Sequence, residues 1–87
     1  MFNRALKSAN LGSNSIGDEG TAALSEALKS NSTLEELKLY YNAIGVAGAQ
    51  SLANMLQFNR ALTSLDLRRN KIGAGGAKAI ADSLPQS

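Results

Sequence analysis

The chain has 87 residues, 44% of them hydrophobic, and its 9 Lys and Arg against 7 Asp and Glu give a net charge of +2. This composition predicts one globular domain at most and argues against disorder. The sequence has no Cys and no His, which excludes disulfides, Cys/His zinc sites, thiol nucleophiles and imidazole bases. We therefore expect no metal and no cofactor.

Neither a nucleic acid nor a membrane is an expected partner. The basic residues are scattered along the sequence, whereas a nucleic-acid binder clusters them on one face. No apolar run approaches the ~18–20 residues of a membrane span. The N-terminal residues lack the apolar stretch of a signal peptide, and together with the absence of Cys this predicts a cytoplasmic location.

The sequence repeats itself with a period of 28 residues and without gaps. A fixed period of this length is typical of a solenoid or another repeat architecture. We expect a single domain over residues 1–87 with repeats at about 3–30, 31–58 and 59–86. The repeated columns are Leu6, Leu34 and Leu62; Leu11, Leu39 and Leu67; Asn14, Asn42 and Asn70; Ile16, Ile44 and Ile72; Gly17, Gly45 and Gly73; Gly20, Gly48 and Gly76; and Leu28, Leu56 and Leu84.

The first repeat is predicted to contain a strand, a turn and a helix. Its strand has Ala9 where the other repeats have leucine, so it packs less apolar volume. Leu24 and Leu28 then fall four residues apart, which is the helical period. Asp18 and Glu19 are expected in the first turn of this helix, where carboxylates suit the helix dipole.

The second and third repeats follow the same plan. Leu37 and Leu39 alternate with polar residues, which is the period of a half-buried strand. After Gly45 the apolar spacing becomes helical, with Leu52, Met55 and Leu56 three to four residues apart. The third repeat shows the same change of period, and its helix is predicted from Ile80 and Leu84.

Strand–helix–strand units run parallel through right-handed crossovers. Neighbouring strands lie ~4.8 Å apart, whereas packed helices need ~8–10 Å. The stack is therefore expected to curve, with a parallel sheet on the concave side and helices on the convex side. The predicted fold class is an α/β solenoid of three repeats.

The second repeat, LEELKLYYNAIGVAGAQSLANML over residues 34–56, resembles the leucine-rich repeat of ribonuclease inhibitors, NOD-like receptors and Ran GTPase-activating proteins. The third repeat, LTSLDLRRNKIGAGGAKAIADSL over residues 62–84, fits equally well. The resemblance implies a ribonuclease-inhibitor-like horseshoe fragment. It also implies that Asn14, Asn42 and Asn70 form a hydrogen-bonded ladder across neighbouring turns.

Two other repeated features favour structural roles. The run GAGGAK at residues 73–78 resembles a phosphate-binding loop, but its glycines are repeat positions that also occur in the other units. Asn31 and Asn59 follow the predicted helices. A left-handed residue commonly ends a helix, and Asn tolerates that conformation second only to Gly, so we expect it there.

Side chains of the strands alternate in direction, so Glu36, Lys38 and Tyr40 are expected on the concave face. Their neighbours in the third repeat would be Ser64, Asp66 and Arg68, with Tyr41 and Arg69 at the rim. One hypothesis is a partner-binding patch, because Tyr and Arg are enriched in binding hot spots. The alternative is that Tyr40 merely stacks on Arg68 while Lys38 and Asp66 form a surface ion pair.

The leading functional prediction is a non-catalytic scaffold that binds another protein through the concave face. A GTPase-activating module is the first alternative, and a structural or engineered self-assembling fragment is the second. Three strands are few for gripping a partner, and neither end repeat has a recognisable cap. Two explanations follow: the chain is an excised or designed portion of a longer array, or copies of it associate with one another. We expect self-association through the end repeats or the exposed sheet edge.

Overall fold

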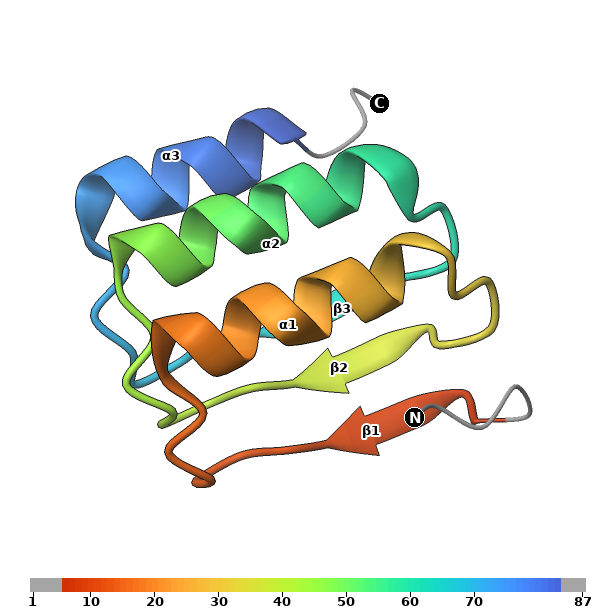
Figure 1. Cartoon of the computed structure of the whole chain (residues 1–87), viewed down its shortest axis with the longest axis horizontal. Helices are drawn as coiled ribbons and strands as arrows, with labels where there is room; N and C mark the ends of the chain where they lie inside the picture. The colour runs from red at the N-terminus through yellow and green to blue at the C-terminus, as the bar shows by residue number, and fades with distance from the viewer. Residues whose placement is uncertain (1–5, 84–87) are drawn as a thin grey trace.

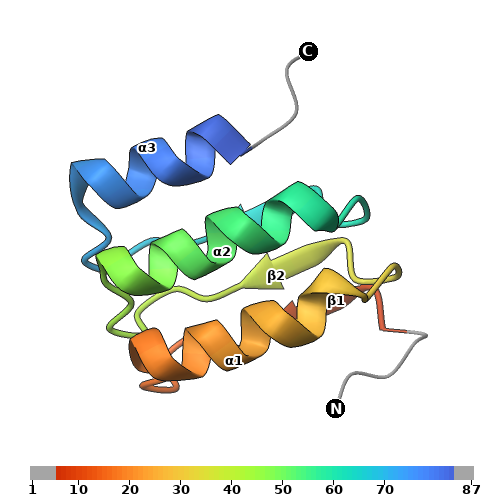
Figure 2. The same ribbon diagram turned by 45° about the horizontal axis from the view of Figure 1, so that its top comes forward.

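The computed structural model describes residues 6–83, which form two layers, with three helices packed on one face of a sheet (Figures 1 and 2). Strand and helix alternate along the chain as the sequence predicts, and the residue Leu84 of the predicted third helix lies outside the described residues. The elements are β1 (Ser8–Asn10), α1 (Gly17–Lys29), β2 (Glu36–Lys38), α2 (Val46–Phe58), β3 (Ser64–Asp66) and α3 (Gly73–Ser83).

The three strands form one parallel sheet in the order β1-β2-β3. Every strand pair joins residues 28 positions apart, as in the pairing of Ala9 with Leu37 and of Leu37 with Leu65. The sequence period is therefore the register of the sheet. This confirms the predicted α/β solenoid and places equivalent residues of successive repeats side by side.

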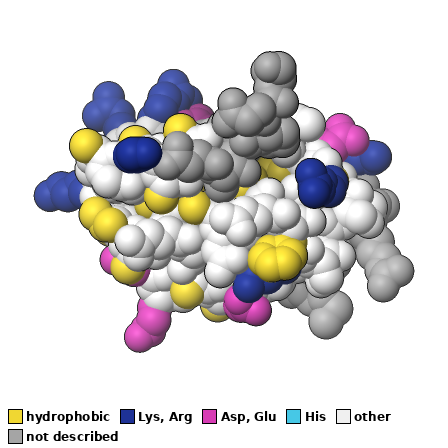
Figure 3. Space-filling view, turned by 90° about the horizontal axis from the view of Figure 1, so that it is seen from above, with side chains coloured by type: hydrophobic (Ala, Val, Ile, Leu, Met, Phe, Trp, Pro, Cys, Tyr) yellow, Lys and Arg dark blue, Asp and Glu magenta, His cyan; other side chains and the backbone are white. Residues whose placement is uncertain are grey.

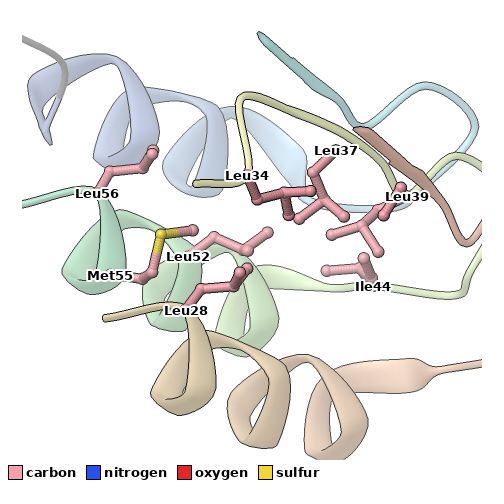
Figure 4. Close-up of a cluster of buried hydrophobic side chains, with 9 residues drawn as sticks. Leu28, Leu34, Leu37, Leu39, Ile44, Leu52, Met55 and Leu56 are labelled. Atoms are coloured by element: carbon pink, nitrogen blue, oxygen red, sulfur yellow. The ribbon is translucent and has the colours of Figure 1, made fainter. Parts of the chain in front are cut away.

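The core lies between the sheet and the helix layer and is centred on the middle repeat (Figure 4). Leu34, Leu37, Leu39 and Leu52 have no exposed surface, and Figure 4 shows them directed into the space between strand and helix. Burial of each such side chain stabilises the fold by about 1.5–3 kcal/mol. The equivalent leucines of the third repeat, Leu62, Leu65 and Leu67, pack against this core but stay partly exposed.

Two different constraints explain the repeated glycines within residues 73–78. Gly73 has a left-handed backbone, with a φ of 68°, whereas close approach of the helices explains Gly76 and its equivalent Gly48. A Cβ added to Gly76 would lie 2.9 Å from the Cβ of Ala49, which is too close for an ordinary contact. Gly48 is in the same situation one repeat earlier, where a Cβ would lie 2.7 Å from Oδ1 of Asp18. These glycines are packing positions, and the helices approach one another because they carry no side chain there.

Asparagines connect the repeats where each strand turns toward its helix. Oδ1 of Asn42 accepts hydrogen bonds from the backbone N–H groups of Asn14 and Ile16, at 2.8 and 3.2 Å. Its Nδ2 donates to the carbonyl oxygens of Leu11 and Tyr40, at 2.9 and 3.2 Å. Asn70 repeats this arrangement one turn further on, where its Oδ1 accepts from the N–H of Asn42 at 2.8 Å. The polar groups of the buried turns are thereby satisfied.

A second pair of asparagines connects the repeats at the opposite end of the helices. Nδ2 of Asn59 donates to the carbonyl oxygens of Leu28 and Asn31, at 2.7 and 3.0 Å. Oδ1 of Asn59 accepts from the N–H groups of Ala61 and Leu62, at 2.9 and 2.8 Å. The prediction that Asn31 and Asn59 adopt a left-handed conformation is wrong. Asn31 does not have a positive φ, and Asn59 is extended, with a φ of −82° and a ψ of 123°. Its side chain, not its backbone, is what the position requires.

Asp18 lies in the first turn of α1, as expected, but its carboxylate also reaches the next helix. Oδ1 accepts hydrogen bonds from the N–H groups of Gly45 and Gly48, at 2.7 and 2.9 Å, and so caps the N-terminus of α2. These N–H groups have no partner within their own helix, and the dipole of α2 favours a negative charge there. The corresponding position between α2 and α3 is Val46, which is 46% exposed.

We predict that Val46→Asp stabilises the fold by about 1 kcal/mol, because the new carboxylate would cover the start of α3 as Asp18 covers that of α2. Urea denaturation would measure the change. Ala47→Asp is the matched control, since it adds the same charge to the same exposed first turn without pointing to α3 through the repeat register. Equal stability of the two variants would contradict the proposed link.

Candidate partner-binding face

The outer face of the sheet carries the residues that the sequence singled out. Leu37 is fully buried, so Glu36 and Lys38 on either side of it face away from the core. The register places Lys38 between Asn10 and Asp66. Strand spacing is shorter than helix spacing, so this sheet side is the concave side.

Charge is unevenly distributed over this face. Glu35 and Glu36 are held by the first repeat, through Lys7 at 3.4 Å and the hydroxyl of Ser8 at 3.0 Å. The side chains toward the third repeat are mostly cationic. Within residues 6–83, three cations on this side take part in no ion pair, namely Lys38, Arg69 and Lys71.

Arg68 folds back along its own strand onto Asp66. Its Nη2 lies 2.9 Å from Oδ2 of Asp66, its Nε lies 3.0 Å from Oδ1, and its backbone N–H donates to the same Oδ1 at 3.1 Å. The guanidinium is therefore held in a fork, while 80% of the Arg68 side chain stays exposed. Asp66 therefore pairs with Arg68, and the alternative expectation of an ion pair between Asp66 and Lys38 is wrong.

Tyr40 leans the other way, toward the first repeat. A Cβ added to Gly12 would overlap the Tyr40 ring, so the ring occupies the space that the missing side chain leaves. The expected stacking of Tyr40 on Arg68 is wrong for this reason. The cation held over an aromatic ring among residues 6–83 is Lys29, 5.4 Å from the centroid of Phe58. A hollow of about 150 Å³ is lined instead by Tyr40, Arg68 and Arg69.

Tyr41 and Arg69 lie at the rim, where the chain turns toward the helices. Both have left-handed backbones, with φ of 54° and 60°, which costs about 1–2 kcal/mol for a residue with a side chain. The asparagine ladder holds these turns in place, and 64% of Tyr41 is exposed. A shallow groove of about 410 Å³ runs along this rim and is lined by Ser13, Ser15, Tyr41, Asn42, Ala43, Arg69, Asn70 and Lys71.

Sequence reasoning missed the roles of Gly12 and Lys71. Gly12 stands 28 residues before Tyr40 in the sequence, but only the structure shows that a glycine there leaves room for the ring of Tyr40. Lys71 belongs to the rim groove because the same turn that exposes Arg69 brings it there. Together with Arg69 it makes this part of the rim cationic.

Other kinds of site find little support in the described chain. Figure 3 looks onto the helix layer, where hydrophobic side chains of the described residues lie scattered among polar atoms. Over residues 6–83 there is no group of three or more Asp, Glu, His or Cys placed to hold a metal ion. No helix in that part of the chain has the length and apolar character needed to cross a membrane.

Comparison with family models gives a match to "Leucine Rich repeat" at residues 2–25, 30–53 and 58–81. The chain belongs to the leucine-rich repeat family. The three matched segments are spaced by the 28-residue period of the sequence. No curated protein matches. The ribonuclease-inhibitor-like subfamily stays a prediction.

Two solved leucine-rich repeat structures superpose closely on this chain. Actin-binding site 2 of leiomodin-1 is 28% identical, with a TM-score of 0.83 over 88% of this chain. The tropomodulin C-terminal domain of Caenorhabditis elegans is 21% identical, with a TM-score of 0.83 over 93% of this chain, a likeness of fold. The chain spans about half of each, 45% of the leiomodin-1 chain and 49% of the tropomodulin chain.

The fork between Arg68 and Asp66 predicts a measurable pKa change. The side-chain and backbone hydrogen bonds from Arg68 lower the pKa of Asp66 below its ordinary value. Because the pKa of Asp66 is lower in the folded chain than in the unfolded chain, the ionised carboxylate stabilises the fold above about pH 4. This stabilisation is lost as the pH falls through the folded-state pKa.

We predict that Arg68→Ala moves the pKa of Asp66 upward, as measured by NMR titration of the carboxyl carbon. Arg69→Ala is the control and should leave it unchanged; an equal shift in both variants would show that net charge, not the fork, is the cause.

Proposed function

We propose that this leucine-rich repeat chain is a non-catalytic scaffold that binds another protein through its concave face. The contact surface would centre on Tyr40 and Arg68 and extend to the rim at Tyr41 and Arg69. The observation that supports it best is the hollow of about 150 Å³ that Tyr40, Arg68 and Arg69 line together, with Tyr41 in the neighbouring rim groove. Tyr and Arg contribute disproportionately to binding hot spots.

The electrostatics favour an acidic partner surface. Lys38, Arg69 and Lys71 take part in no ion pair within residues 6–83, whereas the acids of the second repeat already have partners. Cations placed in this way speed association with an acidic surface and fix its orientation. The fork with Asp66 holds Arg68 in one geometry, so less side-chain freedom is lost when a partner binds.

Actin is the first partner to test. The leiomodin-1 structure that this chain resembles is described as an actin-binding site, at 28% identity and a TM-score of 0.83. This chain spans 45% of that structure. That these 87 residues are enough to bind actin is therefore itself proposed here. We do not propose the GTPase-activating alternative, because the described residues add no observation in its favour.

We predict that replacing Tyr40 and Arg68 together with Ala leaves the fold intact and weakens binding to fluorescently labelled actin at least about tenfold, or 1.4 kcal/mol. Both side chains are outside the core, so circular dichroism should stay unchanged. Gln50→Ala, at an exposed position of α2 in the helix layer, is the matched control and should bind as the unchanged chain does.

Three outcomes would count against this function. If the double variant binds actin as tightly as the unchanged chain, the concave face is not the contact surface. If Gln50→Ala weakens binding equally, the helix layer is involved. If the unchanged chain does not bind actin at all, actin is removed as the partner.

A further inference from the structure

We propose that the rim groove binds an extended acidic segment of a protein partner through the carboxylates of that segment. The rim groove is the hollow of about 410 Å³ that is lined by Ser13, Ser15, Tyr41, Asn42, Ala43, Arg69, Asn70 and Lys71. It is a second contact site beside the concave face, and it rests on the proposed function in that its ligand is part of a protein.

The rim groove is centred on the middle repeat, so the repeats that border it both belong to this chain. Asn42, which lines it, has no exposed surface, and residues of the first and third repeats lie on either side. The three turns that lead from strand to helix lie side by side along one edge of the molecule, at the left of Figure 1. A groove across three turns spans two strand spacings of ~4.8 Å each, which suits an extended segment.

Unusual backbone conformations gather in this groove. Among residues 6–83, every non-glycine residue with a positive φ lines it, namely Ser13, Ser15, Tyr41, Ala43 and Arg69. Glycine would adopt these conformations without steric cost, yet the chain has side chains at all five positions. Strained residues that the surrounding structure holds in place cluster at ligand-binding sites.

The groove offers cations and hydrogen-bond donors, and its lining residues include no Asp or Glu. Arg69 and Lys71 are exposed and take part in no ion pair within residues 6–83. The backbone N–H groups of Ser15 and Ala43 meet no acceptor in that part of the chain. A carboxylate accepts hydrogen bonds from all these groups, and those from arginine and lysine are strengthened by charge.

The spacing of the two cations favours carboxylates that alternate along the bound segment. Arg69 and Lys71 are two residues apart, so their Cα atoms are separated by no more than about 7 Å. Every second side chain of an extended segment points the same way, with a repeat of about 6.6 Å. Two such carboxylates can therefore meet one cation each, while the exposed ring of Tyr41 offers contact to an apolar neighbour.

Arg69→Gln combined with Lys71→Gln tests the site, because it removes both charges at exposed positions and keeps long polar side chains there. Arg60→Gln combined with Lys78→Gln is the matched control, since it removes two charges from exposed positions outside the groove. The probe is a fluorescein-labelled peptide with glutamate at every second position, and the same peptide with glutamine instead is the neutral probe. Fluorescence anisotropy measures their binding to the 87-residue chain.

We expect the glutamate peptide to bind the unchanged chain more tightly than the glutamine peptide does. The Arg69/Lys71 variant should bind the glutamate peptide at least about fivefold more weakly, since two ion pairs are lost. The Arg60/Lys78 control should stay within about twofold of the unchanged chain, because charges remote from the groove are screened by salt. Circular dichroism verifies folding, and Lys71→Gln alone replaces the pair if the double variant does not fold.

NMR places the bound peptide. The backbone amide signals of Ser15 and Ala43 should shift when the glutamate peptide is added, because their N–H groups gain an acceptor. The variant in which Tyr40 and Arg68 are both Ala should bind this peptide as the unchanged chain does, since neither residue lines the groove. A chain that binds the peptide but not actin would therefore count against actin as the partner and leave the rim site standing.

Any of four results would overturn the proposal. Equal binding of the two peptides would show that the carboxylates are not recognised. Equal weakening in the Arg69/Lys71 variant and the Arg60/Lys78 control would show a general attraction of charge. Amide signals of Ser15 and Ala43 that do not move on binding would place the peptide elsewhere. A single-stranded oligonucleotide that binds as tightly as the glutamate peptide would show that the rim holds any polyanion.

Discussion

The leucine columns between neighbouring repeats are the interaction on which the rest of the structure depends. One repeat contributes a three-residue strand and a short helix, which together cannot enclose their own leucines. Leu37 and Leu39 reach full burial only because a repeat lies on either side, whereas Leu65 and Leu67 stay partly exposed at the end of the stack. The hydrogen bonds that run between repeats, from the asparagine side chains and from Asp18, satisfy the polar groups of the connecting turns.

The candidate binding face follows from this arrangement. A parallel sheet with a 28-residue register aligns equivalent side chains in columns, so neighbouring repeats determine what surrounds each one. Tyr40 lies over Gly12 of the preceding repeat, and the rim residues Tyr41 and Arg69 keep their left-handed turns because the asparagine ladder fixes them. The repeat geometry therefore determines where these side chains lie on the concave face and its rim.

Much of the fold could be predicted because the repeat period determines it. Identical spacing of leucines, asparagines and glycines gave the strands, the helices, the register and the face to which Glu36 and Lys38 belong. The pairing of side chains on that face could not be predicted. Lys38 and Arg68 both lie near Asp66, and only the structure shows that Arg68 forms the pair, through its Nε and Nη2. The conformation of Asn59 was mistaken because residue preference describes isolated helix ends, whereas here the side chain spans two repeats.

Amide hydrogen exchange measured by NMR tests the central claim, that coverage by two neighbours stabilises the middle repeat. The N–H groups of Leu11 and Leu39 are matched probes, because each donates to a carbonyl oxygen of the following repeat at 2.8 Å. Leu39 has a repeat on either side, whereas Leu11 is in the first of the described repeats. The account predicts that Leu39 exchanges much more slowly than Leu11, together with the global unfolding of the chain. The account would be contradicted if the two amides exchanged at equal rates, with a free energy of opening well below the free energy of global unfolding.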